Sequence, residues 1–188
     1  MATAAPRPWY ERPLTHRDID DLPEDEHVRY EVIDGELYMA PFPFIPHQQV
    51  ATALVAILWA YLKQHSVGRV FLSNTKVVLD EPTGVGPDLV YVARDHLGMV
   101  REDGIYGAPD LMVEVTSSKP NLDRVVKYRK YASAGVRSYW IIDPAARTLD
   151  AFELRGERYE LVTEAKGDET FEPGLFPGLA IPLADLWG

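Results

Sequence analysis

Two carboxylates and a basic segment follow one another closely in the middle of this chain of 188 residues. Asp88 opens the apolar run that begins after Gly86-Pro87, and Glu114 lies inside the next apolar run, residues 111–115. A stretch with helical spacing follows and carries Lys127. Neighbouring carboxylates repel each other, and a hard divalent cation commonly relieves that repulsion. Together these groups predict a site that holds a divalent metal against a phosphodiester.

Glu114 is the most anomalous of these residues, because its neighbours Met112, Val113 and Val115 are apolar. A buried carboxylate without a partner costs several kcal/mol. Three explanations are open: Glu114 faces solvent at the edge of a half-covered strand, it pairs with a basic side chain, or it binds a metal. Asp88, 26 residues earlier, favours the metal, although an aspartate after Gly-Pro is by itself typical of a turn.

Lys127 has two interpretations. Asp123, Lys127 and Tyr131 are spaced i, i+4 and i+8, so they share one face of the predicted helix. In the first interpretation, Asp123 and Lys127 form an ordinary ion pair worth a few tenths of a kcal/mol. In the second, Lys127 reaches over the strand end and stabilises negative charge on the phosphorus atom. The apolar residues of this segment, which we expect on another face packed on the sheet, are Leu122, Val125, Val126 and Ala132.

The first half of the chain predicts a hairpin between two helices. Asp34-Gly35 favours a type I′ turn, because both residues tolerate positive φ. In that turn Ile33 pairs with Glu36 and Glu31 with Tyr38, so the two glutamates point to the same face. The other elements expected here are a helix over 15–22 with Thr15 and Asp18 at its start, a helix from His47 to about residue 64, and a strand over 70–79.

The second half predicts strands and one further helix. The expected elements are a turn at 82–84, strands at 88–92, 111–115 and 136–142, a helix over 121–134 closed by Gly135, a hairpin of 148–154 with 158–163 around Gly156, and a loop from Pro173. This order predicts a central mixed sheet flanked by helices, an α/β or α+β fold. The length suits one domain over residues 15–188, preceded by a flexible lead-in over 1–14 that lacks the build of a secretory signal.

Composition narrows the class of function. The formal net charge is −10, which counts against a protein that coats nucleic acid without specificity. There are no cysteines, so any metal has oxygen or imidazole ligands, and a cytoplasmic location is expected. The sequence has no long uncharged apolar run, so it contains no candidate for a membrane span. Residues 119–130 hold five basic residues and one acid, and form either a basic wall beside the site or a solvated helix face.

Several motifs, taken in order, carry a family resemblance. They are Tyr30-Glu31-Val32-Ile33-Asp34-Gly35-Glu36, His47-Gln48, Pro87-Asp88-Leu89, residues 109–117, residues 123–128, Tyr131 and residues 139–144. This pattern resembles the Uma-two family of bacterial endonucleases, which have the restriction-endonuclease-like PD-(D/E)XK core. The resemblance implies a mixed sheet flanked by helices, and a bound Mg²⁺ or similar ion such as Mn²⁺ held by Asp88 and Glu114.

The resemblance also implies roles for further residues. The superfamily's lysine usually lies two residues after the second acid, and this chain has Thr116 at that position. Lys127 is therefore expected to take the role, with Lys119 as its rival. Glu31 is the candidate for an additional upstream acid, with Glu36 as its rival.

The activity that the resemblance implies is hydrolysis of DNA phosphodiester bonds by a metal-dependent endonuclease. Asp88, Glu114 and the carbonyl oxygen of Val115 would hold Mg²⁺, which would keep several waters, activate one of them and bind a phosphate oxygen. Two alternatives stay open: a non-catalytic nucleic-acid-binding or regulatory module that kept the fold, and a metal-dependent hydrolase of another phosphoester. A homodimer is expected by analogy with enzymes that cut both strands.

The remaining polar and aromatic motif residues are expected to serve the structure. His47 precedes a helix and either caps it or contacts substrate, with the structural role preferred. The other expectations are that Tyr131 and Tyr139 are core or hydrogen-bonding groups and that Trp140 packs in the core.

Overall fold

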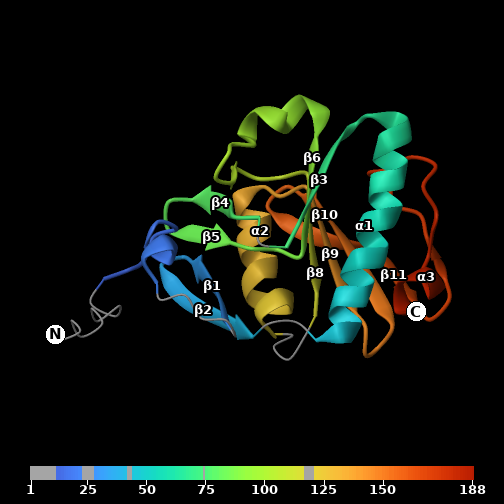
Figure 1. Ribbon diagram of the computed structural model, residues 1–188, viewed down its shortest axis with the longest axis horizontal. Coiled ribbons are helices and arrows are strands. Elements are labelled where there is room, and N and C mark those ends of the chain that lie inside the picture. The colour runs from blue at the N-terminus through green and yellow to red at the C-terminus, as the bar shows by residue number, and fades with distance from the viewer. Residues whose placement is uncertain (1–11, 23–27, 42–43, 74, 117–120) are drawn as a thin grey trace.

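Three β-sheets organise the structure, a computed structural model that describes residues 12–22, 28–41, 44–73, 75–116 and 121–188 (Figure 1). The strands of the five-stranded sheet are, in spatial order, β2 (Glu36–Pro41), β1 (Val28–Ile33), β5 (Thr83–Val85), β4 (Val77–Asp80) and β7 (Ile105–Tyr106). Those of the six-stranded sheet are β11 (Arg158–Lys166), β10 (Thr148–Arg155), β9 (Ser138–Asp143), β8 (Leu111–Val115), β6 (Leu89–Ala93) and β3 (Gly68–Leu72). A two-stranded sheet pairs β12 (Thr170–Phe171) with β13 (Ile181–Pro182).

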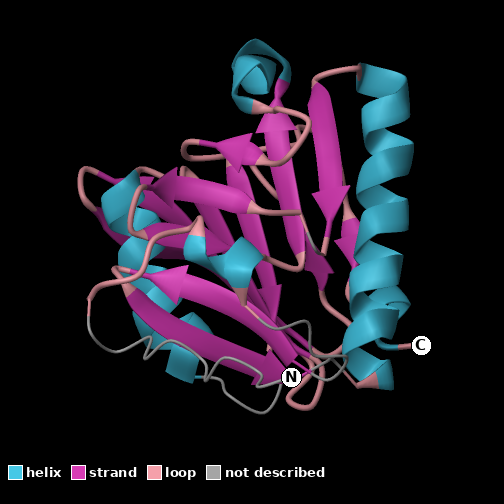
Figure 2. Cartoon of the chain, turned by 60° about the vertical axis from the view of Figure 1, so that its left-hand side comes forward, coloured by secondary structure: helices cyan, strands magenta, loops and turns pink. Residues whose placement is uncertain are grey.

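The helices flank these sheets. They are α1 (Ile45–His65), α2 (Tyr128–Ala134) and α3 (Ala184–Trp187), with the short segments η1 (Asp18–Asp21), η2 (Arg94–Met99) and the π-helical η3 (Leu122–Lys127). Helix α1 runs along one side of the six-stranded sheet, and α2 lies on its other side together with the five-stranded sheet (Figures 1 and 2). In the described part of the chain, none of the helices combines the length and apolar character that crossing a bilayer requires.

Both large sheets are mixed, which confirms the expected fold class. Strand β8 runs parallel to β9 and antiparallel to β6, and β4 runs parallel to β7 and antiparallel to β5. The sequence suggested a central mixed sheet, and in the structure the strands divide between two large mixed sheets.

Alternate residues of β8 enter two different hydrophobic clusters. Leu111 and Val113 pack with α1 in the first cluster, whereas Met112 packs with α2 and the five-stranded sheet in the second. Side chains two residues apart on a strand share a face, so Glu114 points to the same side as Met112. Glu114 is only 4% exposed. The strand therefore carries a carboxylate into the space between the six-stranded sheet and α2.

The predicted hairpin of β1 and β2 is confirmed. Ile33 pairs with Glu36 and Glu31 with Tyr38, as the turn predicts. Asp34 has a φ of 50° and Gly35 a φ of 85°, the two positive values of a type I′ turn. The N–H of Leu14 donates to the carbonyl oxygen of Gly35 at 2.9 Å, so the preceding segment packs on this turn.

Replacing Gly35 with alanine is expected to lower the free energy of unfolding by about 2 kcal/mol or more. Positive φ disfavours alanine, and its Cβ would lie 2.8 Å from the Cβ of Pro13. Gly156→Ala is the matched control, because Gly156 has a φ of 63° and a Cβ there meets nothing within 4 Å. Urea unfolding followed by circular dichroism measures both losses. Equal losses would contradict the close packing of Pro13 on the turn.

Two sequence-based elements in the middle of the chain are wrong. The strand expected over 70–79 is two strands: β3 ends at Leu72 and pairs with β6, whereas β4 begins at Val77 and pairs with β5 and β7. The chain passes from one large sheet to the other between them. The turn expected at 82–84 is also displaced, since Thr83 and Gly84 belong to β5.

The N-terminal helix is shorter than expected. Of residues 15–22 only η1 is helical, although Asp18 Oδ2 accepts hydrogen bonds from the N–H and the hydroxyl of Thr15 at 2.7 and 2.9 Å. Most of the expected lead-in, residues 1–11, lies outside the described residues. Leu14 at its end is buried.

The expected loop from Pro173 is interrupted by β13 and α3, and this tail contributes to the core. Phe176, Ile181 and Leu186 are fully buried in the cluster that contains α1. The ring of Phe176 packs edge-on against Tyr91 with a centroid distance of 4.8 Å. The tail covers apolar surface that α1 leaves open on the six-stranded sheet.

Candidate active site

Lys127 lies at the centre of a buried group of carboxylates. Its Nζ atom is 2.9 Å from Glu31 Oε2, 3.0 Å from Glu114 Oε1 and 3.7 Å from Asp123 Oδ1. Lys127 is 4% exposed. Burial by itself disfavours the ammonium, but the charges of Glu114 and Glu31 outweigh burial and raise the pKa of Lys127. Lys127 is therefore a fixed positive charge.

The π-helical segment η3 places Lys127 there. The N–H of Tyr128 bonds to the carbonyl oxygen of Asp123, an i to i−5 bond, and the hydroxyl of Tyr139 donates to the same oxygen at 3.1 Å. Asp123, Lys127 and Tyr131 share one face as predicted, and all three are buried. The expectation that Val125 packs on the sheet is wrong, because Val125 is 42% exposed.

Glu114 is buried and paired, so the explanation that it faces solvent is wrong. Its Oε1 atom accepts hydrogen bonds from Lys127 and, at 2.8 Å, from the hydroxyl of Tyr131. Its Oε2 atom accepts no hydrogen bond from the residues that the structure describes. Burial raises the pKa of Glu114 well above its ordinary value, Lys127 opposes that rise, and nearby carboxylates add to it. Three carboxyl groups thus share the one ammonium of Lys127.

Asp88 precedes β6 and faces the end of β8. Its Oδ2 atom accepts the N–H of Val115 at 2.8 Å and lies 2.9 Å from Nε2 of His47. Its Oδ1 atom has a longer contact of 3.5 Å with Arg29. Burial would raise the pKa of Asp88, but the hydrogen bond and charge of His47 and the N–H of Val115 outweigh burial and lower it. Asp88 is therefore ionised, with Oδ1 only weakly engaged.

His47 is a site residue that sequence reasoning did not assign. It lies in the first turn of α1, whose N-cap is Phe44, so His47 is not the cap. Its side chain is 4% exposed and contacts Asp88, and its Nδ1 atom is buried without a partner among the described residues. Arg29 and Asp123 were likewise not assigned. His47 and Asp123 are identified by their burial and Arg29 by its contact with Asp88, and neither feature leaves a periodic signal in a sequence.

Glu31, rather than Glu36, lies in the group around Lys127. Glu31 is on β1, between β2 and β5, and its Oε1 atom accepts the N–H of Gly86 at 2.8 Å. Glu36 is on the edge strand β2, is exposed and accepts the hydroxyl of Tyr38 at 3.1 Å. The register puts both glutamates on the same face, but Glu31 on the inner strand is buried in the site whereas Glu36 on the edge strand is exposed.

The comparisons with known proteins concern the family and the fold. The sequence model of a family described as "Putative restriction endonuclease", Uma2, matches residues 17–184. The chain belongs to the Uma2 family. The resemblance drawn from the motifs is thereby confirmed. No curated protein matches the chain.

A solved structure shares the fold of this Uma2 protein. It is described as "a putative nuclease belonging to DUF820" from Anabaena variabilis ATCC 29413. The two chains superpose with a TM-score of 0.74 at 21% sequence identity, over 93% of this chain and 98% of the other. This similarity supports the restriction-endonuclease-like fold, with mixed sheets flanked by helices.

The donor groups of the site suit a hard cation. Asp88 is ionised, and Glu114 has an oxygen without a hydrogen bond in the described part of the chain. Among the described residues, no group of three or more carboxylate or imidazole side chains is arranged to hold a metal. Mg²⁺ usually keeps several waters and binds through one or two carboxylates, so two such side chains fit it.

Of the two interpretations of residues 119–130, the basic wall is not formed by the residues of this segment that the structure describes. Lys127 and Lys130 are buried against carboxylates, and Arg124 pairs with Asp150 at 2.6 Å. Lys119, the rival of Lys127, lies outside the described residues. The basic side chains therefore mostly neutralise acids of this Uma2 protein.

A pocket of about 270 Å³ opens beside the buried group. The residues that line it include Asp20, Arg29, Glu31, Lys76 and Gly86. Glu31, which lines this pocket, also contacts Lys127, so the pocket and the buried group share this residue.

Proposed function

We propose that this Uma2 protein is a metal-dependent endonuclease that hydrolyses DNA phosphodiester bonds. The observation that carries the proposal is the Lys127 ammonium, held at 2.9 and 3.0 Å between Glu31 and Glu114. A fixed ammonium among carboxylates, beside a pocket, provides a cation where charge develops and acids where a metal binds. Membership of the Uma2 family supports a nuclease.

Asp88, Glu114 and the carbonyl oxygen of Val115 would hold Mg²⁺ or Mn²⁺. When bound, the metal lowers the pKa of a water and binds a phosphate oxygen. Val115 donates its N–H to Asp88, so the two residues are already fixed relative to each other. His47 holds the same Asp88 oxygen and leaves Oδ1 for the cation.

Lys127 would act on the phosphate, and Glu31 would hold Lys127 in position. The Lys127 ammonium stabilises the negative charge that develops on the phosphate oxygens. Glu31 orients Lys127 through its 2.9 Å contact. Arg29 lines the pocket, with a side chain that is 22% exposed, and would contact the phosphate as it enters.

The test is cleavage of plasmid and single-stranded DNA with Mg²⁺ or Mn²⁺. Wild type is expected to cut DNA. Asp88→Asn and Glu114→Gln, purified by the same procedure, are expected to be inactive. Equal cutting by the variants would assign the activity to a contaminant. No cutting by the wild type, with metal bound, would favour a non-catalytic module or a hydrolase of another phosphoester.

Two further predictions concern organisation. We propose that residues 15–188 form one domain, which the family match over 17–184 supports, and that the protein pairs as a homodimer by analogy with enzymes that cut both strands. Sedimentation equilibrium with and without DNA measures the oligomeric state. A monomer under both conditions would contradict the homodimer.

His47→Leu is expected to weaken Mn²⁺ binding about tenfold or more, because the partner that orients a metal-binding carboxylate typically contributes that much. His47→Gln is the matched variant, since its amide nitrogen reaches nearly as far as Nε2 and preserves the hydrogen bond to Asp88. Calorimetric titration with Mn²⁺ measures both. Similar losses in the two variants would show that packing, not the hydrogen bond, is what His47 provides.

A further inference from the structure

A second pocket, of about 310 Å³, adjoins the one beside Glu31. Lys76 lines both pockets, so the two are neighbours. Between Glu31 on β1 and Lys76 just before β4 lies only β5. Neighbouring strands are about 4.8 Å apart, so the second pocket begins about 10 Å from the strand that carries Glu31. The two pockets are therefore close enough for one polymer strand to reach both.

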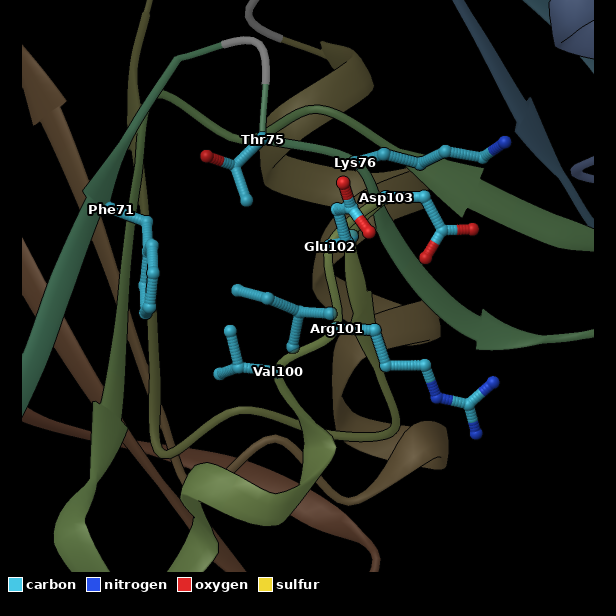
Figure 3. Close-up of a pocket in the computed structure, with 9 residues that line it drawn as sticks. Phe71, Thr75, Lys76, Val100, Arg101, Glu102 and Asp103 are labelled. Atoms are coloured by element: carbon cyan, nitrogen blue, oxygen red, sulfur yellow. The ribbon is translucent and has the colours of Figure 1, made fainter.

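The second pocket combines three apolar side chains, those of Phe71, Val100 and Ile105, with polar and charged residues. Figure 3 shows Phe71 on one side of the pocket and Val100 facing it from below. Thr75 and Glu102 lie together at the upper end, whereas the side chain of Arg101 extends away from Phe71. A flat ring fits between apolar walls of this kind, and a carboxylate at the rim accepts hydrogen bonds from an exocyclic amine.

The charges around the second pocket do not select a phosphate. Lys76 pairs with Asp20 at 2.8 Å. Arg101 lies with its guanidinium carbon 4.1 Å from the ring centre of Tyr106, beside Asp103, which accepts the hydroxyl of Tyr106 at 2.7 Å. Each cation of the rim thus has an acidic side chain close by. The pocket suits a neutral ring better than an anion.

The loop that forms one wall is held in place by its backbone. The N–H of Arg101 donates to the carbonyl oxygen of Gly104 at 2.8 Å, and the N–H of Ile105 to that of Lys76 at 2.9 Å. Gly104 has a φ of 158°, and a Cβ there would lie 2.7 Å from the carbonyl oxygen of Lys76. The wall is therefore a fixed turn packed on the strand that leads into β4.

We propose that the second pocket binds one unstacked nucleobase of a single DNA strand whose phosphate lies at the Glu31 side. Phe71 stacks on the base, and Glu102 accepts a hydrogen bond from the exocyclic amine of adenine or cytosine. The volume, about 310 Å³, is at the lower end for ligand sites and suits one nucleotide. This inference deepens the proposed nuclease function and rests on it for the position of the phosphate.

The test is binding of fluorescent oligonucleotides of ten dA, ten dC or ten dT nucleotides, measured by anisotropy. The buffer contains EDTA, so that neither metal nor cleavage is needed. Wild type is expected to bind dA and dC more tightly than dT. Phe71→Ala is expected to weaken binding of all three about tenfold. Glu102→Gln is expected to reduce the preference for dA and dC about fivefold, with less effect on dT.

The controls separate this proposal from the nuclease proposal. Glu157→Gln removes an exposed glutamate in the turn between β10 and β11 and is expected to leave binding unchanged. Because Phe71 is partly buried, circular dichroism checks that Phe71→Ala folds, and Glu102, which is exposed, supplies an independent variant. Unchanged affinity and base preference in Glu102→Gln would overturn the base site even if wild type cuts DNA. Pocket-dependent binding without cleavage by metal-loaded wild type would overturn only the nuclease.

Discussion

Replacing Lys127 with methionine is expected to abolish DNA cleavage and to lower the free energy of unfolding by about 3–5 kcal/mol at pH 7.5 without metal. The variant removes the ammonium that lies within 3.0 Å of both Glu31 and Glu114. Their carboxylates would then be buried without a cation. Urea unfolding and the plasmid assay measure the two losses.

Added Mn²⁺ is expected to restore part of that stability, because a divalent cation can replace the lost positive charge. Metal affinity should be kept or increased, since Lys127 is not a ligand. A loss of Mn²⁺ affinity as large as that of Glu114→Gln would contradict the role assigned to Lys127.

Lys130→Met is the matched control for Lys127→Met. Lys130 also contacts two carboxylates, Asp34 and Asp80, but these are 67% and 43% exposed. Solvent screens such pairs, so removing Lys130 should cost less stability and leave cleavage intact. Equal effects of the two variants would indicate that Lys127 serves only the structure.

Glu114→Gln is expected to abolish cleavage and metal binding while keeping the metal-free fold. At saturating Mn²⁺, about 100 times the dissociation constant, the wild type should gain about 2.7 kcal/mol of stability, and this variant should gain none. Glu36→Gln removes the exposed glutamate of β2 and should behave as wild type. Thermal unfolding with and without Mn²⁺ measures the difference. A metal-induced gain in Glu114→Gln would contradict its role as ligand.

The pH dependence of metal-free stability provides an independent check on Glu114. Burial raises the pKa of Glu114, and it raises that of Asp123 from 3.8 to about 6. The native state then binds more protons than the unfolded chain, so stability falls as pH rises from about 4 to above 6. Asp88, whose pKa is lowered, acts in the opposite sense at more acidic pH. Glu114→Gln should reduce this loss of stability with rising pH. Added Mn²⁺ should oppose the same loss in the wild type.

The sequence predicted the parts of the site that local rules govern. Asp34-Gly35 determines the hairpin and its register, so Glu31 could be placed opposite Tyr38. Helical spacing placed Asp123, Lys127 and Tyr131 on one face. The division of residues 70–79 between two sheets could not be predicted, because both strands have similar β propensity and only their distant partners differ.

The contacts that sequence reasoning did not find are long-range. His47 reaches Asp88 across 41 residues, and Glu31 reaches Gly86 across 55. Such pairs depend on how α1 and β1 pack on the strands, which no local pattern specifies. The absence of a basic wall has a related cause. Lys127 and Lys130 direct their ammonium groups toward acids of other elements instead of toward solvent.

Anomalous diffraction from crystals of the wild-type protein grown with Mn²⁺ tests the central claim most directly. The account predicts one strong anomalous peak in contact with side-chain oxygens of both Asp88 and Glu114, with Lys127 close by. A protein saturated with Mn²⁺ that shows no peak there, or a peak bound only by other carboxylates such as Asp34 and Asp80, would contradict it.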